Sequence, residues 1–521
     1  MRQETDVLII GSGINSLVAA LVSQRNGLQV SVFEQASETG GAVRSGAYTE
    51  PGFTHDWAAM NLSLFAGSPF FQEFGPELME AGLEFALAQH CFASSFADGR
   101  WLGIGNDVDA NVEKISAFAN NDSEAWRALT TAFPDQAAHI FAILGSSFGL
   151  RSVAKNSWNL LRDRKLSGAL DLGRFLASSP RAWLDETFSS EHVKATLAAW
   201  GMHLDFAPDI AGGAVFPYLE AMANQAFGMV IGKGGADTVT RSLIKCITDR
   251  GGSVVCDAAV QQVLIEQGRA VGIRLADGRD HYASKSVIAN VAPKNLSKLI
   301  GDTDPTYDKG LQSFRHAPGT LMIHLAMEDL PDWTAAPQLR DYAYVHLAPS
   351  LDQMARCYQQ AQAGLLPQEP VVVVGQPTAI DPTRAPDGKH VLWLQVRMVP
   401  GVIKGDAAGE IAARDWQEAA APMAARALDI LETHAPGIRA KIIGQRIVSP
   451  IELEADNPNL VGGDQICGSH HLSQHFVYRP QRGRSDGTTP IKNLYHTGAA
   501  VWPGAGTGAG PGYLLGKKLT T

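Results

Sequence analysis

The chain has 521 residues and a formal net charge of −10. This length is enough for two or three domains with sizeable cores, and the acidic balance argues against nucleic acid as a general partner. The 52 glycines and 27 prolines suit a loop-rich α/β protein. No apolar run approaches the roughly 20 residues needed to span a bilayer, so we expect a cytoplasmic protein.

The first 35 residues have the pattern of a dinucleotide-binding βαβ unit. An apolar strand over 6–10 leads directly into Gly11-Ser12-Gly13 and a helix, and a second strand over 30–33 ends at Glu34. Gly11 permits the tight turn, Gly13 lets a pyrophosphate approach the backbone, and the helix N-terminus offers N–H groups to the phosphates. We expect Glu34 to accept hydrogen bonds from ribose hydroxyls and to disfavour a 2′-phosphate, which makes NADP an unsuitable ligand.

Two further segments point to a long dinucleotide that carries a flat ring. Gly40-Gly41 is followed three positions later by Arg44, which is expected to bind a phosphate; a flexible loop with a surface arginine is the alternative. Near the other end, a strand over 493–499 runs into residues 504–512, which contain five glycines. Such glycine density fits backbone laid against a flat ligand. A helix starting near Tyr513 would then direct its N-terminus at the reduced flavin.

With these pieces, the chain resembles the FAD-dependent phytoene desaturase superfamily, within the amine-oxidase-like flavoproteins. The matching residues are Gly11–Asn15, Glu34, Gly40–Arg44, Pro51–Phe53, Gly234–Asp237 and the segment from Pro490 to Gly512. Within the superfamily, Ser449-Pro450, Gly462-Gly463 and Tyr478-Arg479-Pro480 are similar to the bacterial carotene-ketolase-like branch, which includes pyridine nucleotide-disulfide oxidoreductase domain-containing proteins. One departure is Cys467, which stands where that branch is expected to carry a histidine.

The resemblance implies an α/β fold with a discontinuous Rossmann-like FAD-binding domain and an inserted mixed α+β substrate domain. The FAD-binding domain is expected over 1–70, 227–293 and 449–521, and the substrate domain over 71–226 and 294–448. The pattern predicts mostly helices in 71–226. It also predicts strands over 286–290, 320–327, 371–375 and 390–398, and a helix over 411–434.

The implied cofactor is non-covalent FAD. The residues expected to bind it are Gly11, Gly13, Ile14, Asn15, Ser16, Glu34, Gln35, Gly41, Ala42, Arg44, Ala58, Ala59, Met60, Val260, Gly498, Ala499, Gly506, Thr507 and Gly508. Of these, Val260 is carried over from the family, in which the backbone near this position meets the adenine.

No catalytic residue is assigned. His55 is a candidate acid–base, and the preferred alternative is a structural pair of His55 with Asp56. Phe476 and Tyr478 are candidates for lining an apolar cavity. No metal is expected, because His470, His471 and His475 have the spacing of a polar loop rather than of a ligand set.

The leading hypothesis is an FAD-dependent dehydrogenase or desaturase that removes hydride from a lipophilic, isoprenoid- or carotenoid-like substrate to flavin N5. The electron acceptor would be a quinone, oxygen or another protein. An oxidase or ketolase and a redox-neutral isomerase on the same scaffold stay open, as does a non-enzymatic prenyl-binding protein. A flavin disulfide reductase is excluded, because residues 1–90 contain no cysteine and the five in the chain form no Cys-x-x-Cys pair.

A basic stretch stands out in the acidic chain. Residues 151–174 carry six basic and two acidic side chains, interleaved with Trp158 and several leucines. A basic amphipathic helix can lie on an anionic membrane, so peripheral contact with the inner face of the membrane through 151–174 is one interpretation. An ordinary solvated helix face is the other, and it is the preferred one.

Overall fold

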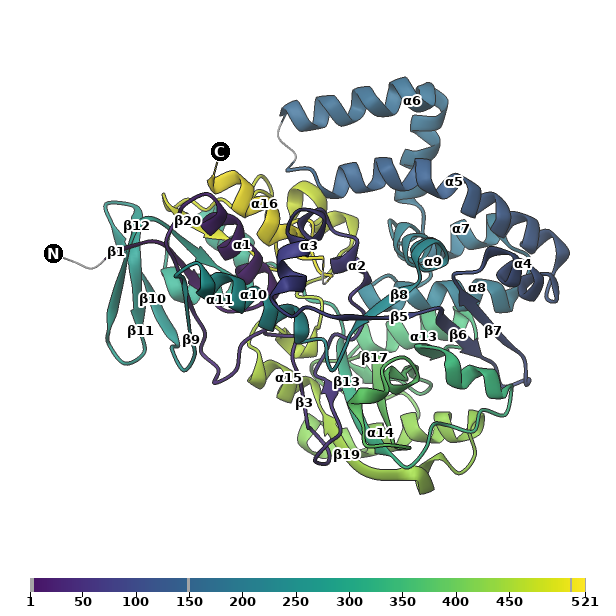
Figure 1. Ribbon diagram of the computed structural model, residues 1–521. Coiled ribbons are helices and arrows are strands. Elements are labelled where there is room, and N and C mark those ends of the chain that lie inside the picture. Colours follow the sequence, from purple (N-terminus) through teal and green to yellow (C-terminus); the bar gives the residue numbers. More distant parts are fainter. Residues whose placement is uncertain (1–3, 148–149, 507, 521) are drawn as a thin grey trace.

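The structure, a computed structural model, describes residues 4–147, 150–506 and 508–520. Two large sheets organise the chain (Figure 1). The first sheet has the order β10 (Val260–Glu266), β11 (Arg269–Leu275), β12 (Asp280–Ala289), β1 (Glu4–Ile10), β2 (Val30–Phe33) and β9 (Ser253–Val255), with β20 (Leu494–His496) pairing β12. From β20 through β12 and β1 to β2 and β9 the pairing is parallel, whereas β10, β11 and β12 pair antiparallel.

Side chains of β1 alternate between two cores, as the period of a strand requires. Val7 and Ile9 pack on the face covered by α1 (Ile14–Arg25) and α10 (Thr238–Asp249). Leu8 and Ile10 pack on the opposite face, where the core is completed by α11 and α12 (Pro293–Ile300 and Pro305–Gln312). Since both faces are buried, the strand is apolar throughout its second half.

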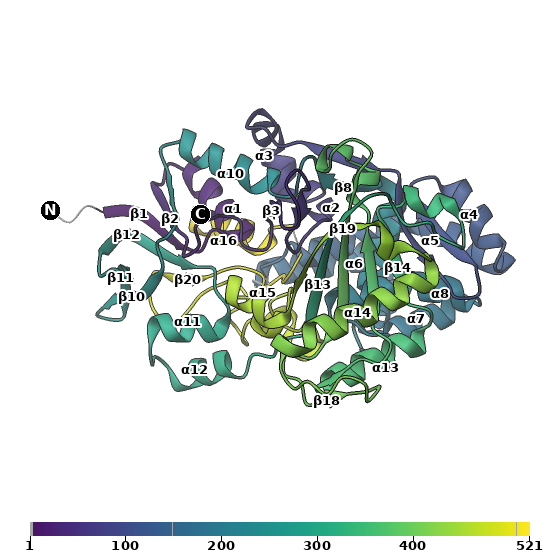
Figure 2. The same cartoon turned by 90° about the horizontal axis from the view of Figure 1, so that it is seen from below.

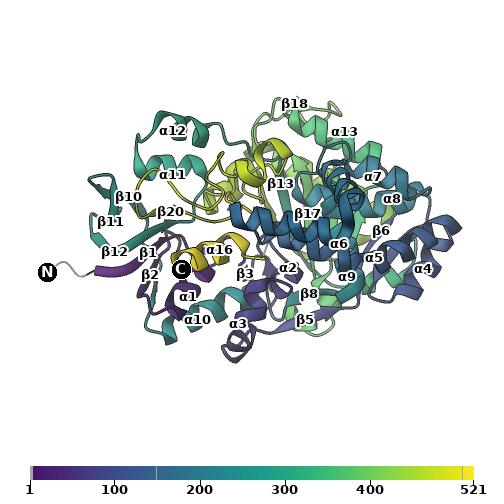
Figure 3. The same ribbon diagram turned by 90° about the horizontal axis from the view of Figure 1, so that it is seen from above.

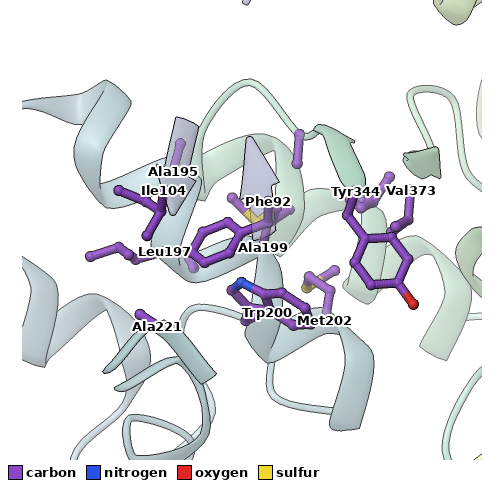
Figure 4. Packing of buried hydrophobic residues seen from close by; sticks show 14 of the residues in the cluster. Phe92, Ile104, Ala195, Leu197, Ala199, Trp200, Met202, Ala221, Tyr344 and Val373 are labelled. Carbon is purple, nitrogen blue, oxygen red and sulfur yellow. The ribbon is translucent and has the colours of Figure 1, made fainter. Parts of the chain in front are cut away.

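The second sheet has the order β19 (Ile442–Val448), β13 (Gly319–Met327), β17 (His390–Val399), β16 (Val371–Gly375), β14 (Tyr344–Leu347), β6 (His90–Ser95) and β7 (Trp101–Gly105). Helix α14 (Trp416–His434) covers the face seen in Figure 2. The opposite face belongs to the core cluster shown in Figure 4, where Phe92 and Tyr344 of the sheet meet Trp200 and Met202. Helices α5 (Asn120–Leu144), α8 (Glu191–Ala198) and α9 (Val215–Phe227) complete this cluster.

The other elements lie around the two sheets. The remaining helices are α2 (Ser63–Ala66), α3 (Pro69–Glu80), α4 (Val108–Ser116), α6 (Leu150–Ala177), α7 (Pro180–Thr187), α13 (Leu351–Gln362), α15 (Pro450–Asp456) and α16 (Gly510–Leu519). The remaining strands pair as β3 (Ser45–Gly46) with β4 (His55–Asp56), β5 (Phe85–Ala88) with β8 (Met229–Gly232), and β15 (Leu365–Leu366) with β18 (Gly405–Asp406). Short 3₁₀ turns lie at Ala199–Leu204, Pro337–Asp341, Pro377–Ala379, Pro382–Arg384, Ile438–Lys441, Val461–Gly463, Leu472–Gln474 and Phe476–Tyr478. In the described part of the chain, no helix is both long and apolar enough to cross a bilayer.

Most predicted elements are present, with shifted ends. The helix predicted over 411–434 begins at Trp416, because the Asp415 side chain caps it by accepting a hydrogen bond from Glu418 N. The mostly helical prediction for 71–226 is incomplete, since the segment also contains β5, β6 and β7. β6 carries no β-branched residue, and its strand state comes from antiparallel pairing with β7 and parallel pairing with β14. The proposed domain boundaries stay a prediction.

A fully buried ion pair joins three distant segments between the sheets. Arg384 Nη1 lies 2.5 Å from Asp56 Oδ2, and both side chains are almost inaccessible to solvent. Asp56 also accepts hydrogen bonds from Ser45 Oγ and Ala236 N, each at 2.7 Å, while Arg384 donates to Gly232 O. Since every polar group here has a partner, the glycine turn at 232–236 is held against the β3–β4 hairpin.

Removing one partner of this pair should destabilise the protein strongly. We expect Asp56→Ala to cost about 3 kcal/mol, because it removes the nearer carboxylate of the buried Arg384 guanidinium and leaves it with Asp381 Oδ2, 3.3 Å from Nε. Asp277→Ala is the matched control: it breaks the exposed pair with Arg279, which contributes about 1 kcal/mol or less. Thermal midpoints measured for both variants should differ by several degrees, and equal midpoints would contradict this role.

Candidate cofactor and active site

The candidate site lies at the carboxyl edge of the first sheet. In register, Ile10 of β1 pairs with Phe33 of β2 and with Ala289 of β12, and Ala289 pairs with His496 of β20. The residues that follow these strands therefore meet at one edge, where open α/β sheets bind their ligands. The predicted residues Gly11, Glu34 and Gly498 are among them, and so is Asn290, which was not predicted.

Three glycines, Gly11, Gly13 and Gly498, pack against Asn290. A methyl group at Gly498 would lie 2.0 Å from Asn290 Oδ1, and one at Gly13 would lie 3.1 Å from Nδ2. Gly498 also has a φ of +103° and Gly11 one of +87°, which favour glycine. Asn290 Nδ2 donates to Ser16 Oγ at 2.9 Å. Close packing of the two turns against Asn290 therefore requires the absence of a side chain at these glycines.

Glu34 is fixed in place by the first glycine turn. Its carboxylate accepts hydrogen bonds from Ser12 N and Oγ, at 2.8 and 2.7 Å, and from Ala36 N at 3.0 Å. The second glycine turn joins this network, because Gly40 N donates to Ser12 Oγ at 3.1 Å. Ala258 N donates to Glu34 O at 2.8 Å, which brings the start of β10, and so the predicted Val260, beside Glu34. Gln35 is exposed.

Arg44 and Gly41 are brought together, and Arg44 already has a partner. Its Nε donates to Gly41 O at 2.9 Å, and its guanidinium pairs with Asp456 of α15. Burial by itself would lower the pKa of Arg44, but the hydrogen bond and charge of Asp456 outweigh it and raise this pKa. The side chain is therefore fixed as a cation beside the second glycine turn, with the neighbouring Ala42 half-buried; its contact with a phosphate stays a prediction.

The C-terminal glycine segment returns to the first helix. No side chain caps the N-terminus of α1, where Ile14 and Asn15 are buried. Asn15 Oδ1 accepts a hydrogen bond from Gly512 N at 3.0 Å, and a methyl group at Gly512 would lie 2.1 Å from Asn15 O. Helix α16 therefore requires glycine at this contact. Gly506 and Gly508 approach Leu64, and Thr507 lies outside the described residues.

The predicted segment 58–60 and Ala499 lie on the side of the second sheet. Ala58 O accepts a hydrogen bond from Gln395 Nε2 of β17 at 3.4 Å. Met60 is buried, and Ala59 is half-buried. Ala499 O accepts one from Arg479 Nη2 at 2.6 Å. These contacts place residues from both ends of the chain between the two sheets.

Sequence reasoning missed two further residues of this region, Arg479 and His470. The fully buried Arg479 donates to the carbonyls of Cys467 and Ser469 as well as to Ala499 O. Burial lowers its pKa to about 10. His470 Nε2 lies 3.1 Å from Ala505 N, which donates to it. The Tyr-Arg-Pro motif indicated a family resemblance, but it did not indicate the contacts of Arg479. The carbonyl groups that Arg479 binds reach it only when the chain folds.

His55 is a poor proton carrier at neutral pH in this structure. It is fully buried, its Nε2 lies 2.7 Å from Thr49 Oγ1, and its ring lies 5.4 Å from that of His324. Burial, aided by the nearby Arg384 charge, lowers its pKa to about 3. The expected pairing of His55 with Asp56 is not found, because Asp56 is taken by Arg384. The prediction that His55 acts as an acid–base stays untested.

Cys467 is buried, and its thiol stays protonated. Its Sγ donates to Asn459 O at 2.9 Å. Burial, with the nearby Asp464 charge, raises the pKa of this thiol to about 12. The residue that stands in place of the family's histidine therefore stays protonated and carries no thiolate chemistry.

The chain is similar to known oxidoreductases along most of its length. Residues 9–74 match a family described as an NAD(P)-binding Rossmann-like domain. Pyridine nucleotide-disulfide oxidoreductase domain-containing protein 2 of Mus musculus is 27% identical over 97% of this chain and 91% of its own. One of the chains of the limonene dehydrogenase of Castellaniella defragrans is 23% identical, over 99% and 94% of the two chains. The lycopene-forming phytoene desaturase of Pseudescherichia vulneris is 22% identical, over 98% and 97%.

Among solved structures, putrescine oxidase bound to putrescine superposes with a TM-score of 0.60 at 16% identity, covering 100% of this chain and 99% of that one. The predicted fold class, an α/β fold of the flavoprotein amine-oxidase type, is thereby confirmed. The predicted resemblance is confirmed as well, since the homologues include phytoene desaturases and pyridine nucleotide-disulfide oxidoreductase domain-containing proteins. These relatives define the class of the chain: it is an oxidoreductase of the flavin-dependent kind.

His496, at the end of β20, allows a test of whether this edge of the sheet is buried in solution. Its Nε2 lies 2.7 Å from Val291 O, and burial lowers its pKa to about 4. Because the unfolded chain protonates this histidine near pH 6.5 and the folded one does so near pH 4, its contribution to stability is complete above pH 6.5 and is lost as pH falls towards 4.

We expect wild type to lose about 2 kcal/mol more than His496→Gln between pH 6.5 and 5.0. The glutamine can still donate to Val291 O, but it does not titrate. Urea unfolding of both proteins at the two pH values measures this difference. Equal losses would show that His496 is not held neutral by the fold.

Proposed function

We propose that the protein is an FAD-dependent dehydrogenase that desaturates a lipophilic, isoprenoid-like substrate, with FAD bound non-covalently. The observation that carries the proposal is the meeting of four parallel-strand ends at one sheet edge, where three glycines from two turns pack against Asn290. It is supported by the length over which the chain resembles a phytoene desaturase and a limonene dehydrogenase chain. Both relatives are named for hydrocarbon substrates of isoprenoid type.

The proposed binding mode divides the cofactor between the two ends of the chain. Gly11 and Gly13 would receive the diphosphate at the N-terminus of α1, and Glu34 would bind the ribose hydroxyls. Arg44 and Gly41 would border the diphosphate from the second turn. The ring would lie along the segment that contains Gly506 and Gly508. When bound, FAD would supply the two-electron acceptor for a substrate C–H bond.

The surroundings of the ring position favour an apolar substrate. Ala58 and Met60 belong to the same buried cluster as Trp200, Tyr344 and Trp393. The cluster offers mainly apolar surface to a substrate, and a polar substrate would lose its hydration on entering it. Within this region the chain's own contribution is to bind and orient the substrate and to exclude water.

The visible absorption spectrum of purified protein tests the proposal, followed by anaerobic reduction and mixing with air. A flavin spectrum whose reduced form persists in air is expected for a dehydrogenase that uses a quinone or a protein acceptor. Reoxidation within seconds would favour the alternative of an oxidase or ketolase. A protein that binds no flavin, even after reconstitution with FAD, would overturn the proposal and leave a non-enzymatic prenyl-binding protein.

The role of Glu34 can be measured separately. Glu34→Ala should weaken FAD binding about 10- to 100-fold, because hydrogen bonds to a carboxylate are lost. Glu124→Ala removes an exposed carboxylate of α5 and should leave the affinity unchanged. Titration of apoprotein with FAD, followed by flavin fluorescence, gives both values. Unchanged binding in Glu34→Ala would place the ribose elsewhere.

A further inference from the structure

Asp205 is a buried carboxylate that lacks the partners such a group usually has. It is 1% exposed, and among the described residues neither of its carboxylate oxygens has a hydrogen bond of good geometry. Its ion-pair partner in that part of the chain is a histidine, His471. Buried carboxylates are normally held by cations or several hydrogen bonds, as Asp56 and Asp464 are in this protein. Asp205 is therefore a candidate for a chemical role.

Strand β17 connects Asp205 with the predicted flavin residue Ala58. Gln395 Nε2 donates to Ala58 O at 3.4 Å. Arg397, two residues further along and hence on the same face of the strand, donates from Nη2 to His203 O at 2.6 Å. Because His203 lies two residues before Asp205, these contacts lead from Ala58 to the turn that carries the carboxylate.

The C-terminal loops give a second connection, to the predicted flavin residue Ala499. Arg479 donates from Nη2 to Ala499 O at 2.6 Å and from Nη1 to Ser469 O at 2.8 Å. The Ser469 side chain faces the Asp205 carboxylate. Since Ala58 and Ala499 are both expected to contact the flavin, both connections lead from Asp205 to the region in which a substrate would react.

A hydrogen-bonded chain leads outward from Asp205. His471 Nε2 lies 3.2 Å from Asp205 Oδ2 and 3.1 Å from Tyr358 Oη of α13. Gln362, one turn further along α13, donates from Nε2 to Tyr358 Oη at 3.0 Å. Figure 3 shows α13 on the same side of the molecule as the yellow-green segment that follows α15. The exposed fraction of the side chain rises from 1% at Asp205 to 25% at His471, and Gln362 is exposed.

Water is available at the outer end of this chain. Gln362 lines a surface pocket of about 240 Å³ together with His316, Val402 and Lys404. A single water needs only about 10–15 Å³ of such space, so the pocket has room for several. The chain thus joins the buried carboxylate to solvent.

Burial shifts the pKa values of Asp205 and His471 towards each other. It raises the pKa of Asp205 to about 7, although the Ser469 and Tyr358 hydroxyls oppose the rise. Burial also lowers the pKa of His471. Two groups of similar pKa exchange a proton without a large change in free energy. The ionisable groups that face Asp205 from the neighbouring elements are Arg397 of β17, Tyr358 of α13, and Asp464, His471 and Arg479 of the C-terminal loops.

From this arrangement we infer that Asp205 and His471 form a proton relay, which carries the proton released by dehydrogenation from the reaction site to solvent. The inference rests on the proposed function for the source of the proton. In desaturation one C–H bond of the substrate gives up a hydride, which takes two electrons to FAD. The adjacent C–H bond breaks, its electron pair forms the new C=C bond, and its proton passes to a carboxylate oxygen of Asp205. His471 Nε2 takes this proton next, and the imidazolium then loses its Nδ1 proton to water.

Proton uptake during reduction of the bound flavin tests the position of Asp205. Anaerobic photoreduction of FAD-loaded protein adds negative charge to the flavin, and a carboxylate close to it should then bind a proton. Near pH 7 Asp205 is about half protonated beforehand, so wild type should take up about half a proton more per flavin than Asp205→Asn. A pH-indicator dye measures this uptake. Asparagine suits the left-handed backbone at this position, where φ is +65°.

The matched control is Asp341→Asn, which removes an exposed carboxylate and should take up as many protons as wild type. Equal uptake by wild type and Asp205→Asn, in proteins that bind and reduce flavin normally, would refute the relay and leave the proposed function intact. A protein that binds no flavin would overturn both.

The rate of the uptake after flash photoreduction tests His471. His471→Gln should slow the uptake that depends on Asp205 about 100-fold, because glutamine keeps a polar contact with Tyr358 but transfers no proton. Added imidazole should restore part of the rate, which it could not do for a misfolded protein. His90→Gln, at an exposed histidine of β6, should react like wild type. An unchanged rate in His471→Gln would exclude His471 from the relay.

Discussion

The parallel pairing of β12 with both β1 and β20 is the constraint on which the rest of the structure depends. It brings the ends of three segments, separated by more than 200 residues in the sequence, to one edge of one sheet. Strands buried on both faces have to satisfy their backbone groups within the sheet, so this register is hard to alter. The edge then gathers the glycine turns around Asn290, and no single segment could form that cradle by itself.

Buried guanidinium groups hold the irregular parts of the molecule. Arg384 and Arg479 are both inaccessible to solvent. Arg384 bonds to Asp56 and Gly232 O from distant segments, whereas Arg479 bonds to carbonyls of the nearby loops at 466–469 and Ala499. A planar group with five donors can satisfy several loops at once. Arg384 secures the turn before α10, and Arg479 secures the loop beside Ala499. The glycine-rich segments thus gain fixed positions without regular secondary structure of their own.

The two faces of the C-terminal glycine segment have different environments. One side reaches α1, where the Asn15–Gly512 contact requires the absence of a side chain. On the other side, Trp502 separates the segment from a cavity of about 420 Å³ between α5 and α6.

Local sequence patterns were sufficient to predict the first βαβ unit and most strands of both sheets. These patterns can be recognised within a short stretch of sequence: the spacing of glycines, an acidic residue at a strand end, and runs of apolar residues. Strand β6 was not predicted, since its state depends on pairing with β7 and β14 rather than on its own composition. The candidate acid–base His55 and its supposed partner Asp56 show a second limit, because the sequence places them side by side while the fold gives each a different partner.

What the sequence by itself determined is the class of cofactor domain, because the turn, the helix start and the acidic strand end are all encoded within 35 consecutive residues. Only the tertiary structure decided which distant groups share the site. Nothing local in the sequence shows what Asn290, Arg479 and His470 contact. They gain their roles because long-range strand pairing and buried charge bring their partners to them, and such contacts leave no local periodicity from which to predict them.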